Sequence, residues 1–211
     1  MNPGPTRPVG LLLAAGRATR YGADKLLAPL SSGEPLALAA ARHLREGLDD
    51  GSSAGARLLA VLRPEQAELS ERLAAAGFEL VVSDEARAGM GRSLALAVAA
   101  SPDASGWLVA LADMPAIQPH TIAQVAAALG DGASIAAPFH AGRRGHPVGF
   151  AASWRDALTR LDGDIGARDL LREAGDALLR IETDDPGVLL DIDTRDDLAI
   201  LCDTIGKRPI S

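Results

Sequence analysis

The sequence predicts an α/β fold: a single domain with a Rossmann-like, mostly parallel central sheet flanked by helices. Short apolar runs alternate with longer helical segments over the first two thirds of the chain, the order that crossover connections between parallel strands produce. A chain of 211 residues can bury a core by itself. Apolar residues make up 47% of the chain and aromatic residues 3%, so Leu, Val, Ile and Ala are expected to fill that core.

The first two thirds of the chain hold the regular elements. Apolar runs predict five strands, at residues 9–14, 57–62, 78–82, 107–112 and 134–138. Segments rich in Ala and Leu predict the four helices between them, at residues 35–48, 64–76, 91–100 and 119–129. Pro64 suits the first turn of its helix, and Gly77 suits the end of the same helix.

The last third of the chain is less regular. Three extended segments are expected, at residues 147–150, 178–182 and 188–190, and two helical ones, at residues 154–161 and 167–175. A final helix is expected at residues 194–205, with Thr194 as its N-cap and Asp197 completing a shortened capping box. The domain is expected to span residues 9–206, between a flexible N-terminal tail (1–8) and a C-terminal tail (207–211).

Composition excludes several classes of protein. The net charge of −7 and the few aromatic residues argue against a nucleic-acid partner. The single cysteine, Cys202, excludes an internal disulfide framework and a cysteine-based zinc site, and it is expected to lie in the core. No apolar run reaches the roughly 18 residues of a membrane span, and the N-terminus does not resemble a signal peptide. We therefore expect a soluble, cytoplasmic protein without a membrane partner.

The loop after the first predicted strand carries the sharpest signal. Its sequence, residues 14–25, is A-A-G-R-A-T-R-Y-G-A-D-K, and it lies where parallel sheets bind ligands. Glycines allow close backbone approach, and Arg17, Arg20 and Lys25 add positive charge, a combination that suits a triphosphate. The loop matches neither G-x-x-x-x-G-K-[ST] nor G-x-G-x-x-G. From composition alone, a solvated basic loop is the alternative interpretation.

Carboxylates at two places predict a metal site. Asp113 directly follows the strand expected at residues 107–112. Asp191 and Asp193 are two residues apart, so in an extended stretch they project to the same face, and either or both can reach one site. Mg²⁺ commonly takes one or two carboxylates together with phosphate oxygens of a substrate. The alternatives are a turn residue for Asp113 and a helix-flanking carboxylate for Asp193.

Two further loops carry candidate residues. Asp84 ends the third predicted strand, where it can accept hydrogen bonds from a ribose or a base, and the helix that follows is opened by Gly89 to Ser93. Backbone N–H groups there can face a nucleotide, although Ser93 also suits a helix N-terminal hydroxyl. The later loop holds Gly145, His146 and Pro147 after two arginines that can bind an anion.

Six segments together resemble the MobA-like NTP transferase family, and more specifically its molybdenum cofactor cytidylyltransferases. The first segment is L-A-A-G-x-x-x-R-x-G-x-x-K, at residues 13–25, and Tyr21 stands where Met or Phe is usual in it. The others follow in the family's order, at residues 89–94, 111–115, 145–148, 163–168 and 191–198. Because these segments span residues 9–200, the resemblance implies a nucleotidyltransferase fold over nearly the whole chain.

The resemblance implies a reaction and a role for each motif. A phosphate of molybdopterin cofactor would attack the α-phosphorus of CTP with Mg²⁺ as cofactor, and a molybdenum hydroxylase is the plausible transient partner that receives the product. Arg20, Lys25 and Asp113 would be catalytic, Asp113 and Asp193 would hold the metal, and Gly145, His146 and Arg168 would contact the second substrate. The nucleotide would be bound by Leu13, Ala14, Ala15, Gly16, Arg20, Gly22, Lys25, Asp84, Gly89, Ser93 and Asp113.

Three alternatives stay open at this point. A guanylyltransferase of the same family is the nearest, and the guanylyltransferases carry a second glycine where this chain has Ala15. A transferase that acts on another phosphorylated metabolite is the next. A non-catalytic, nucleotide-binding chaperone that hands over the cofactor is a third, but such a protein has no need of the carboxylates expected to bind metal.

Overall fold

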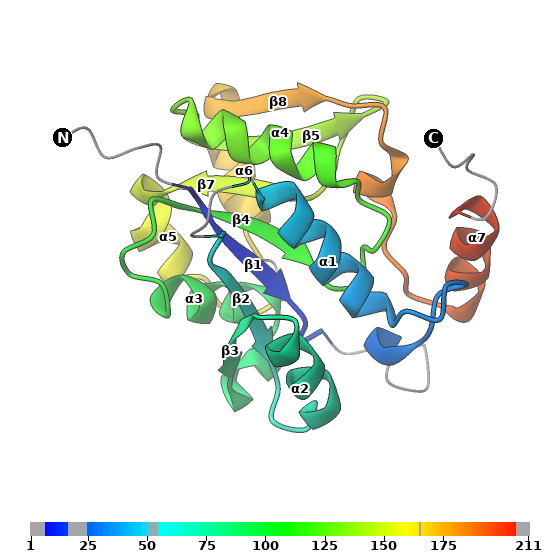
Figure 1. Cartoon of the computed structure of the whole chain (residues 1–211). Coiled ribbons are helices and arrows are strands. Elements are labelled where there is room, and N and C mark those ends of the chain that lie inside the picture. Colours follow the sequence, from blue (N-terminus) through cyan, green and yellow to red (C-terminus); the bar gives the residue numbers. More distant parts are fainter. Residues whose placement is uncertain (1–6, 17–24, 50, 52–54, 165, 206–211) are drawn as a thin grey trace.

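The computed structural model describes residues 7–16, 25–49, 51, 55–164 and 166–205, and the described strands form one mixed sheet (Figure 1). The strand order is β3-β2-β1-β4-β7-β5-β6, and β8 also pairs with β5. Strands β6 and β7 run against the other six, so the expected mostly parallel sheet is confirmed. The strands are β1 (Val9–Leu13), β2 (Leu58–Leu62), β3 (Glu79–Val82), β4 (Gly106–Leu111), β5 (Ile135–His140), β6 (Arg143–Arg144), β7 (Val148–Ala151) and β8 (Leu178–Glu182).

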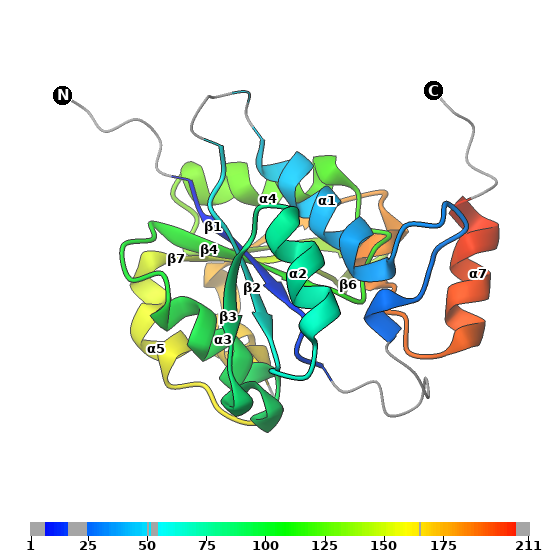
Figure 2. The same cartoon turned by 60° about the horizontal axis from the view of Figure 1, so that its bottom comes forward.

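Helices cover both faces of this sheet. The side chains of successive strand residues point to opposite faces, so Leu12 packs under α1, α2 and α4, whereas Leu11 and Leu13 pack against α3, α5 and α6. Figures 1 and 2 place α7 on the side of the molecule toward which β1 points. The helices are α1 (Leu36–Leu48), α2 (Ala67–Ala75), α3 (Met90–Ala99), α4 (Pro119–Gly130), α5 (Arg155–Thr159), α6 (Arg168–Ala174) and α7 (Arg195–Ile205).

Two sequence-based expectations about local structure are wrong. Helix α2 begins at Ala67 and not at Pro64, because Gln66 accepts a hydrogen bond from the Arg63 N–H and closes a turn before the helix. Residues 188–190 are not extended as a unit, because Pro186–Leu189 form a 3₁₀-helix. Its start is stabilised by Asp185, whose carboxylate accepts from the Gly187 N–H. The two-residue strand β6 was not expected.

The predicted start of the last helix is confirmed. The Thr194 hydroxyl accepts from the Asp197 N–H, and one Asp197 carboxylate oxygen accepts from the backbone N–H groups of Asp193 and Thr194. These bonds satisfy donors that a helix N-terminus leaves free. The Cys202 side chain and the tail residues 1–6 and 206–211 lie outside the described part of the chain. No helix among the described residues is long and apolar enough to cross a membrane.

Candidate functional site

Lys25 joins the two carboxylates that the sequence singles out. Its Nζ lies 3.0 Å from Oδ2 of Asp113 and 3.2 Å from Oδ1 of Asp193. The Lys25 side chain is only 8% exposed, whereas the Asp193 side chain is 52% exposed. A buried ammonium therefore joins the partly buried Asp113, 28% exposed, to the exposed Asp193.

Backbone hydrogen bonds bring these three residues together from distant parts of the chain. The Ala112 N–H donates to the Leu13 carbonyl, so the chain segments that leave β4 and β1 stay side by side. The Ile192 N–H donates to the Asp113 carbonyl at 3.0 Å, which places the segment before α7 against the end of β4. Asp193 therefore reaches Lys25, while the exposed Asp191 does not share that ion pair.

Two neighbouring carboxylates stabilise the protonated, positively charged form of Lys25. Desolvation by burial lowers the pKa of Lys25, but the charge of Asp113 and the hydrogen bonds to Asp113 and Asp193 outweigh it. The net result is a pKa above the ordinary value of a lysine. Lys25 is therefore a fixed cation at neutral pH, as charge neutralisation of a phosphate chain requires.

A pocket of about 360 Å³ opens next to Asp113, on the α3 face of the sheet. Six of the residues predicted to bind nucleotide line it, from β1, from the loop that follows β1, from the start of α3 and from the segment after β4. These six are Leu13, Ala15, Gly16, Gly89, Ser93 and Asp113. Its other lining residues, which sequence reasoning missed, are Ala86, Arg87, Met90, Leu111 and Asp164. The Ala14 side chain packs on the opposite face of the sheet.

Glycines shape the wall of the pocket at the start of α3. Gly89 has a φ of +129°, and a Cβ there would overlap the Gly163 backbone. The Gly91 N–H donates to the Gly163 carbonyl at 2.8 Å, which brings the loop with Asp164 to the pocket. The Ser93 hydroxyl lies in the first turns of the helix and donates to the Gly89 carbonyl at 3.0 Å. This bond joins residues four apart within the helix and is not a cap, because the N-cap position of α3 is occupied by Gly89.

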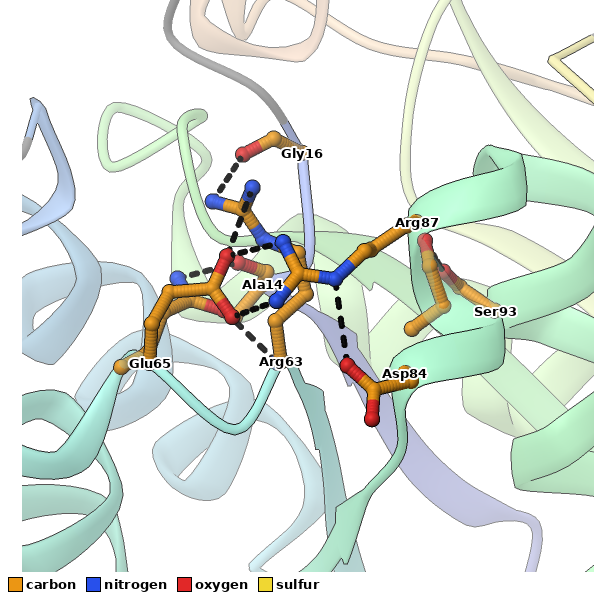
Figure 3. A network of polar contacts seen from close by, with 9 residues as sticks. Ala14, Gly16, Arg63, Glu65, Asp84, Arg87 and Ser93 are labelled. Atoms are coloured by element: carbon orange, nitrogen blue, oxygen red, sulfur yellow. Dashed lines mark hydrogen bonds and ion pairs between the residues drawn. The ribbon is translucent and has the colours of Figure 1, made fainter.

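Asp84 does not line the pocket. Its side chain is 78% exposed, and Arg87 donates to it at 3.2 Å (Figure 3). Arg87 also pairs with Glu65 through two hydrogen bonds of 2.6 Å, and Glu65 contacts Arg63 at 3.3 Å. Sequence reasoning missed this network because its members come from the turn before α2 and from the segment after β3, and no local motif links them.

The residues expected to contact the second substrate lie at two places. The Gly145 N–H donates to the Pro138 carbonyl and the His146 N–H to the Val188 carbonyl, and the His146–Pro147 peptide is cis. Burial lowers the pKa of His146 to about 4, and the charge of Arg144 acts in the same direction. Burial also lowers the pKa of Arg144, and so does the nearby Arg168, which is exposed at the start of α6. The positive charges of Arg144 and Arg168 therefore act on each other, and the two residues are called the Arg144–Arg168 pair below.

The family model described as "MobA-like NTP transferase domain" matches residues 10–178. The chain belongs to this family. It is 33% identical over 201 residues to "Purine catabolism protein PucB" of Bacillus subtilis (strain 168), covering 88% of this chain and 91% of that protein. It is also 28% identical over 193 residues to "Nicotine blue oxidoreductase" of Paenarthrobacter nicotinovorans, with the same coverage.

A solved structure of similar fold is that of Rv0371c from Mycobacterium tuberculosis H37Rv. The two chains share 28% identity with a TM-score of 0.80, over 94% of this chain and 99% of that one. A second structure of Rv0371c, described as a complex with manganese, gives 27% identity and a TM-score of 0.77 over 94% of this chain and 100% of that one. As a member of the MobA-like NTP transferase family, this chain has the fold and the general activity class of a nucleotidyltransferase.

The donor set of this family member suits a divalent cation that substrate phosphates help to bind. Asp113 and Asp193 supply hard oxygen ligands from two distant segments of the chain. They lie close enough together for both to bind one cation, the Lys25 ammonium. Among the described residues, no three His, Cys, Asp or Glu side chains form a group that could hold a metal. The predicted residues Arg20 and Gly22 lie outside the described residues.

Proposed function

We propose that this chain transfers a cytidylyl group from CTP to the terminal phosphate of molybdopterin cofactor. A phosphate oxygen of the acceptor forms a bond to the α-phosphorus of CTP, the bond from that phosphorus to the bridging oxygen breaks, and pyrophosphate leaves. The observation that carries the proposal is the Asp113–Lys25–Asp193 cluster beside the pocket formed by the signature loop and the start of α3.

The residues of this site support each part of that reaction. The acceptor phosphate is already anionic, so catalysis depends on alignment and charge neutralisation and needs no nucleophilic side chain. The pocket holds the nucleotide, while Lys25 and Arg20 offset the charge of its phosphates. Asp113 and Asp193 would hold Mg²⁺, which when bound neutralises and orients phosphate oxygens. The structure of Rv0371c that is described as a complex with manganese supports the use of a divalent cation by a protein of this fold.

The acceptor is proposed to lie near Gly145, His146 and Arg168. This placement follows from the resemblance to the molybdenum cofactor cytidylyltransferases, and the Arg144–Arg168 pair supports an anionic group there. Transfer of the product to a molybdenum hydroxylase stays a prediction.

Pyrophosphate release tests the proposal. The purified protein is incubated with Mg²⁺, purified molybdopterin cofactor and equal concentrations of CTP and GTP, and the dinucleotide product is identified by mass spectrometry. We expect cytosine dinucleotide and one pyrophosphate per product. Mostly guanine product would identify a guanylyltransferase, and release only with another phosphorylated metabolite would replace the acceptor. Nucleotide binding without release in any combination would favour the chaperone.

A single methyl group is expected to contribute to the preference for CTP. Ala15 is buried and lines the pocket where the guanylyltransferases have a second glycine. Because packed sites resist expansion, the methyl group should exclude a purine more strongly than a pyrimidine. We expect Ala15→Gly to lower the CTP-to-GTP ratio of kcat/KM without inverting it. An unchanged ratio would show that other contacts select the base.

A further inference from the structure

Ala15 brings a backbone N–H group to the wall of the pocket. The residue is 4% exposed and lines the pocket together with Leu13 and Gly16. Within the described segments, no acceptor bonds to the Ala15 N–H. Buried backbone N–H groups are rarely left without a partner in native proteins. A ligand bound in the pocket can supply an acceptor for this group.

Gln66 holds the Ala14 carbonyl, which belongs to the same peptide unit as the Ala15 N–H. Its side chain is 5% exposed, and its Nε2 donates to the Ala14 carbonyl at 3.0 Å. Its Oε1 accepts from the Arg63 N–H at 2.9 Å, so the amide is held at both ends and its orientation is defined. Arg63 adds a second contact, because its Nη2 donates to the Gly16 carbonyl at 3.4 Å (Figure 3).

The two groups of this peptide point in opposite directions. In a trans peptide unit the C=O and N–H bonds are antiparallel, so a donor that fixes the Ala14 carbonyl also sets the direction of the Ala15 N–H. The Ala14 N–H donates to the Val61 carbonyl of β2, so both backbone polar groups of Ala14 face the β2 side. The Ala15 N–H therefore faces the side of β4, where Leu111 and Asp113 line the pocket. The hydrogen bond from Gln66 therefore directs the Ala15 N–H toward the pocket.

We propose that Gln66, assisted by Arg63, is a positioning residue of the nucleotide site. It holds the Ala14–Ala15 peptide so that the Ala15 N–H donates to an acceptor oxygen of the bound nucleoside triphosphate. The inference rests on the proposed function only in that the pocket binds a nucleoside triphosphate, and it does not depend on the identity of the acceptor substrate.

Ion pairs of Glu65 connect the residues that hold the loop after β1 with Arg87, which lines the pocket before α3. Glu65 contacts Arg63, which holds Gly16, and binds Arg87, which lines the pocket from the segment after β3. A chain of contacts thus joins the loop after β1 to the segment before α3. These ion pairs are exposed, so each contributes little to stability, and their main effect is on geometry.

The test compares Gln66→Glu with the wild type. The substitution keeps the size of the side chain and the acceptor for the Arg63 N–H, but it removes the donor to the Ala14 carbonyl. We expect the Kd for Mg²⁺–CTP, measured by calorimetry without any acceptor substrate at pH 8, to rise about tenfold. Burial raises the pKa of a carboxyl group, and the protonated acid can donate again. Much of the lost affinity should therefore return at pH 5.5, relative to the wild type at each pH.

Matched variants separate positioning from simple destabilisation. Gln118→Glu makes the same change at another amide that donates to a backbone carbonyl, that of Ala116, and should leave the Kd unchanged. Gln66→Met removes the donor without adding a carboxyl group, and it replaces Gln66→Glu in the test if that variant does not fold. Gln66→Met should weaken the binding of Mg²⁺–CTP at both pH 8 and pH 5.5. A lower Tm with wild-type Kd for CTP in both Gln66→Glu and Gln66→Met would overturn the inference.

The outcome for the inference is distinct from that for the proposed function. If the wild-type protein binds CTP but releases no pyrophosphate, the transfer reaction is contradicted. The positioning role of Gln66 can still be measured through the Kd for CTP. Equal Kd values in the wild type and both Gln66 variants would overturn the positioning role alone. No binding of Mg²⁺–CTP or Mg²⁺–GTP by the wild type would overturn both.

Discussion

At the scale of single residues, the site depends on the Lys25 ammonium, which forms ion pairs with two carboxylates. Lys25 holds Asp113 and Asp193 within 3.2 Å of the same nitrogen atom, although they are 80 residues apart in the chain. Without Lys25, two like charges would face each other at the end of β4. The same ammonium that stabilises the free site is the group proposed to neutralise the phosphates of the nucleotide, so binding and stability are coupled at this residue.

Loss of one carboxylate should remove most of the activity. We expect Asp113→Asn and Asp193→Asn each to lower pyrophosphate release by about a hundredfold or more, because charge and alignment at the phosphates supply most of the catalysis. Melting curves should remain close to that of the wild type, since each variant leaves Lys25 with one carboxylate. Asp191→Asn is the matched control. Near-normal release in Asp113→Asn, or an equal loss in Asp191→Asn, would contradict the assignment.

His146 should make the stability of the fold depend on pH. Its pKa in the folded state is about 4, below the ordinary value of 6.5, so the unfolded chain binds a proton first as the pH falls. The contribution of His146 is therefore complete above about pH 6.5 and is lost between about pH 6.5 and about pH 4. We expect His146→Asn to flatten the pH dependence of the free energy of unfolding in that window, measured by urea denaturation. The same substitution at the exposed His120 should not flatten it.

At the scale of elements, sequence patterns located most of the structure. Strand β8 has the expected bounds, and the capping box before α7 is present as expected, because both depend on neighbouring residues. The start of α2 was misplaced because the Gln66 side chain accepts from the Arg63 N–H and closes a turn before the helix. The same side chain donates to the Ala14 carbonyl, 52 residues away, and no local pattern encodes that contact. The 3₁₀-helix at Pro186–Leu189 was missed because Asp185 caps it and also binds Gln118 and Thr121 from another part of the chain.

The cap of α7 should affect metal use as well as stability. Asp197 accepts from the backbone N–H of Asp193, so the cap fixes the residue proposed to bind the metal. We expect Asp197→Asn to lower Tm and to raise severalfold the Mg²⁺ concentration needed for half-maximal pyrophosphate release. Asp196→Asn, which removes the same charge from the same helical turn, is the control. Identical Mg²⁺ dependence in both variants would show that the cap does not position Asp193.

At the scale of the whole molecule, the two faces of the sheet serve different purposes. Helices α1 and α4 pack together on one face, where Gly47 allows a close approach. The pocket is built on the other face, with α3 and the loop before α6. Packing defects at the contact between α1 and α4 are therefore expected to lower stability without altering nucleotide binding.

Gly47→Ala tests this separation. A Cβ at Gly47 would lie 2.7 Å from the Pro119 carbonyl oxygen and would also overlap the Ile122 side chain. Overpacking of this kind costs about 1–3 kcal/mol, which exceeds the gain of about 1 kcal/mol in helix propensity from Gly to Ala. We expect a lower free energy of unfolding in urea with an unchanged Kd for Mg²⁺–CTP. A weaker Kd would show that the two faces are coupled.

The sequence by itself determined the fold class, the order of the elements and the family motifs, because apolar periodicity, capping residues and signature loops are written in contiguous stretches of chain. It also singled out Lys25, Asp113 and Asp193 one by one. Only the tertiary structure decided that these three meet, that Asp193 and not Asp191 reaches Lys25, and that Asp84 lies outside the pocket. It alone shows the hydrogen bond from Gln66 to the Ala14 carbonyl. Contacts between residues far apart in the chain depend on how the sheet edges and helices pack, and no local pattern records that packing.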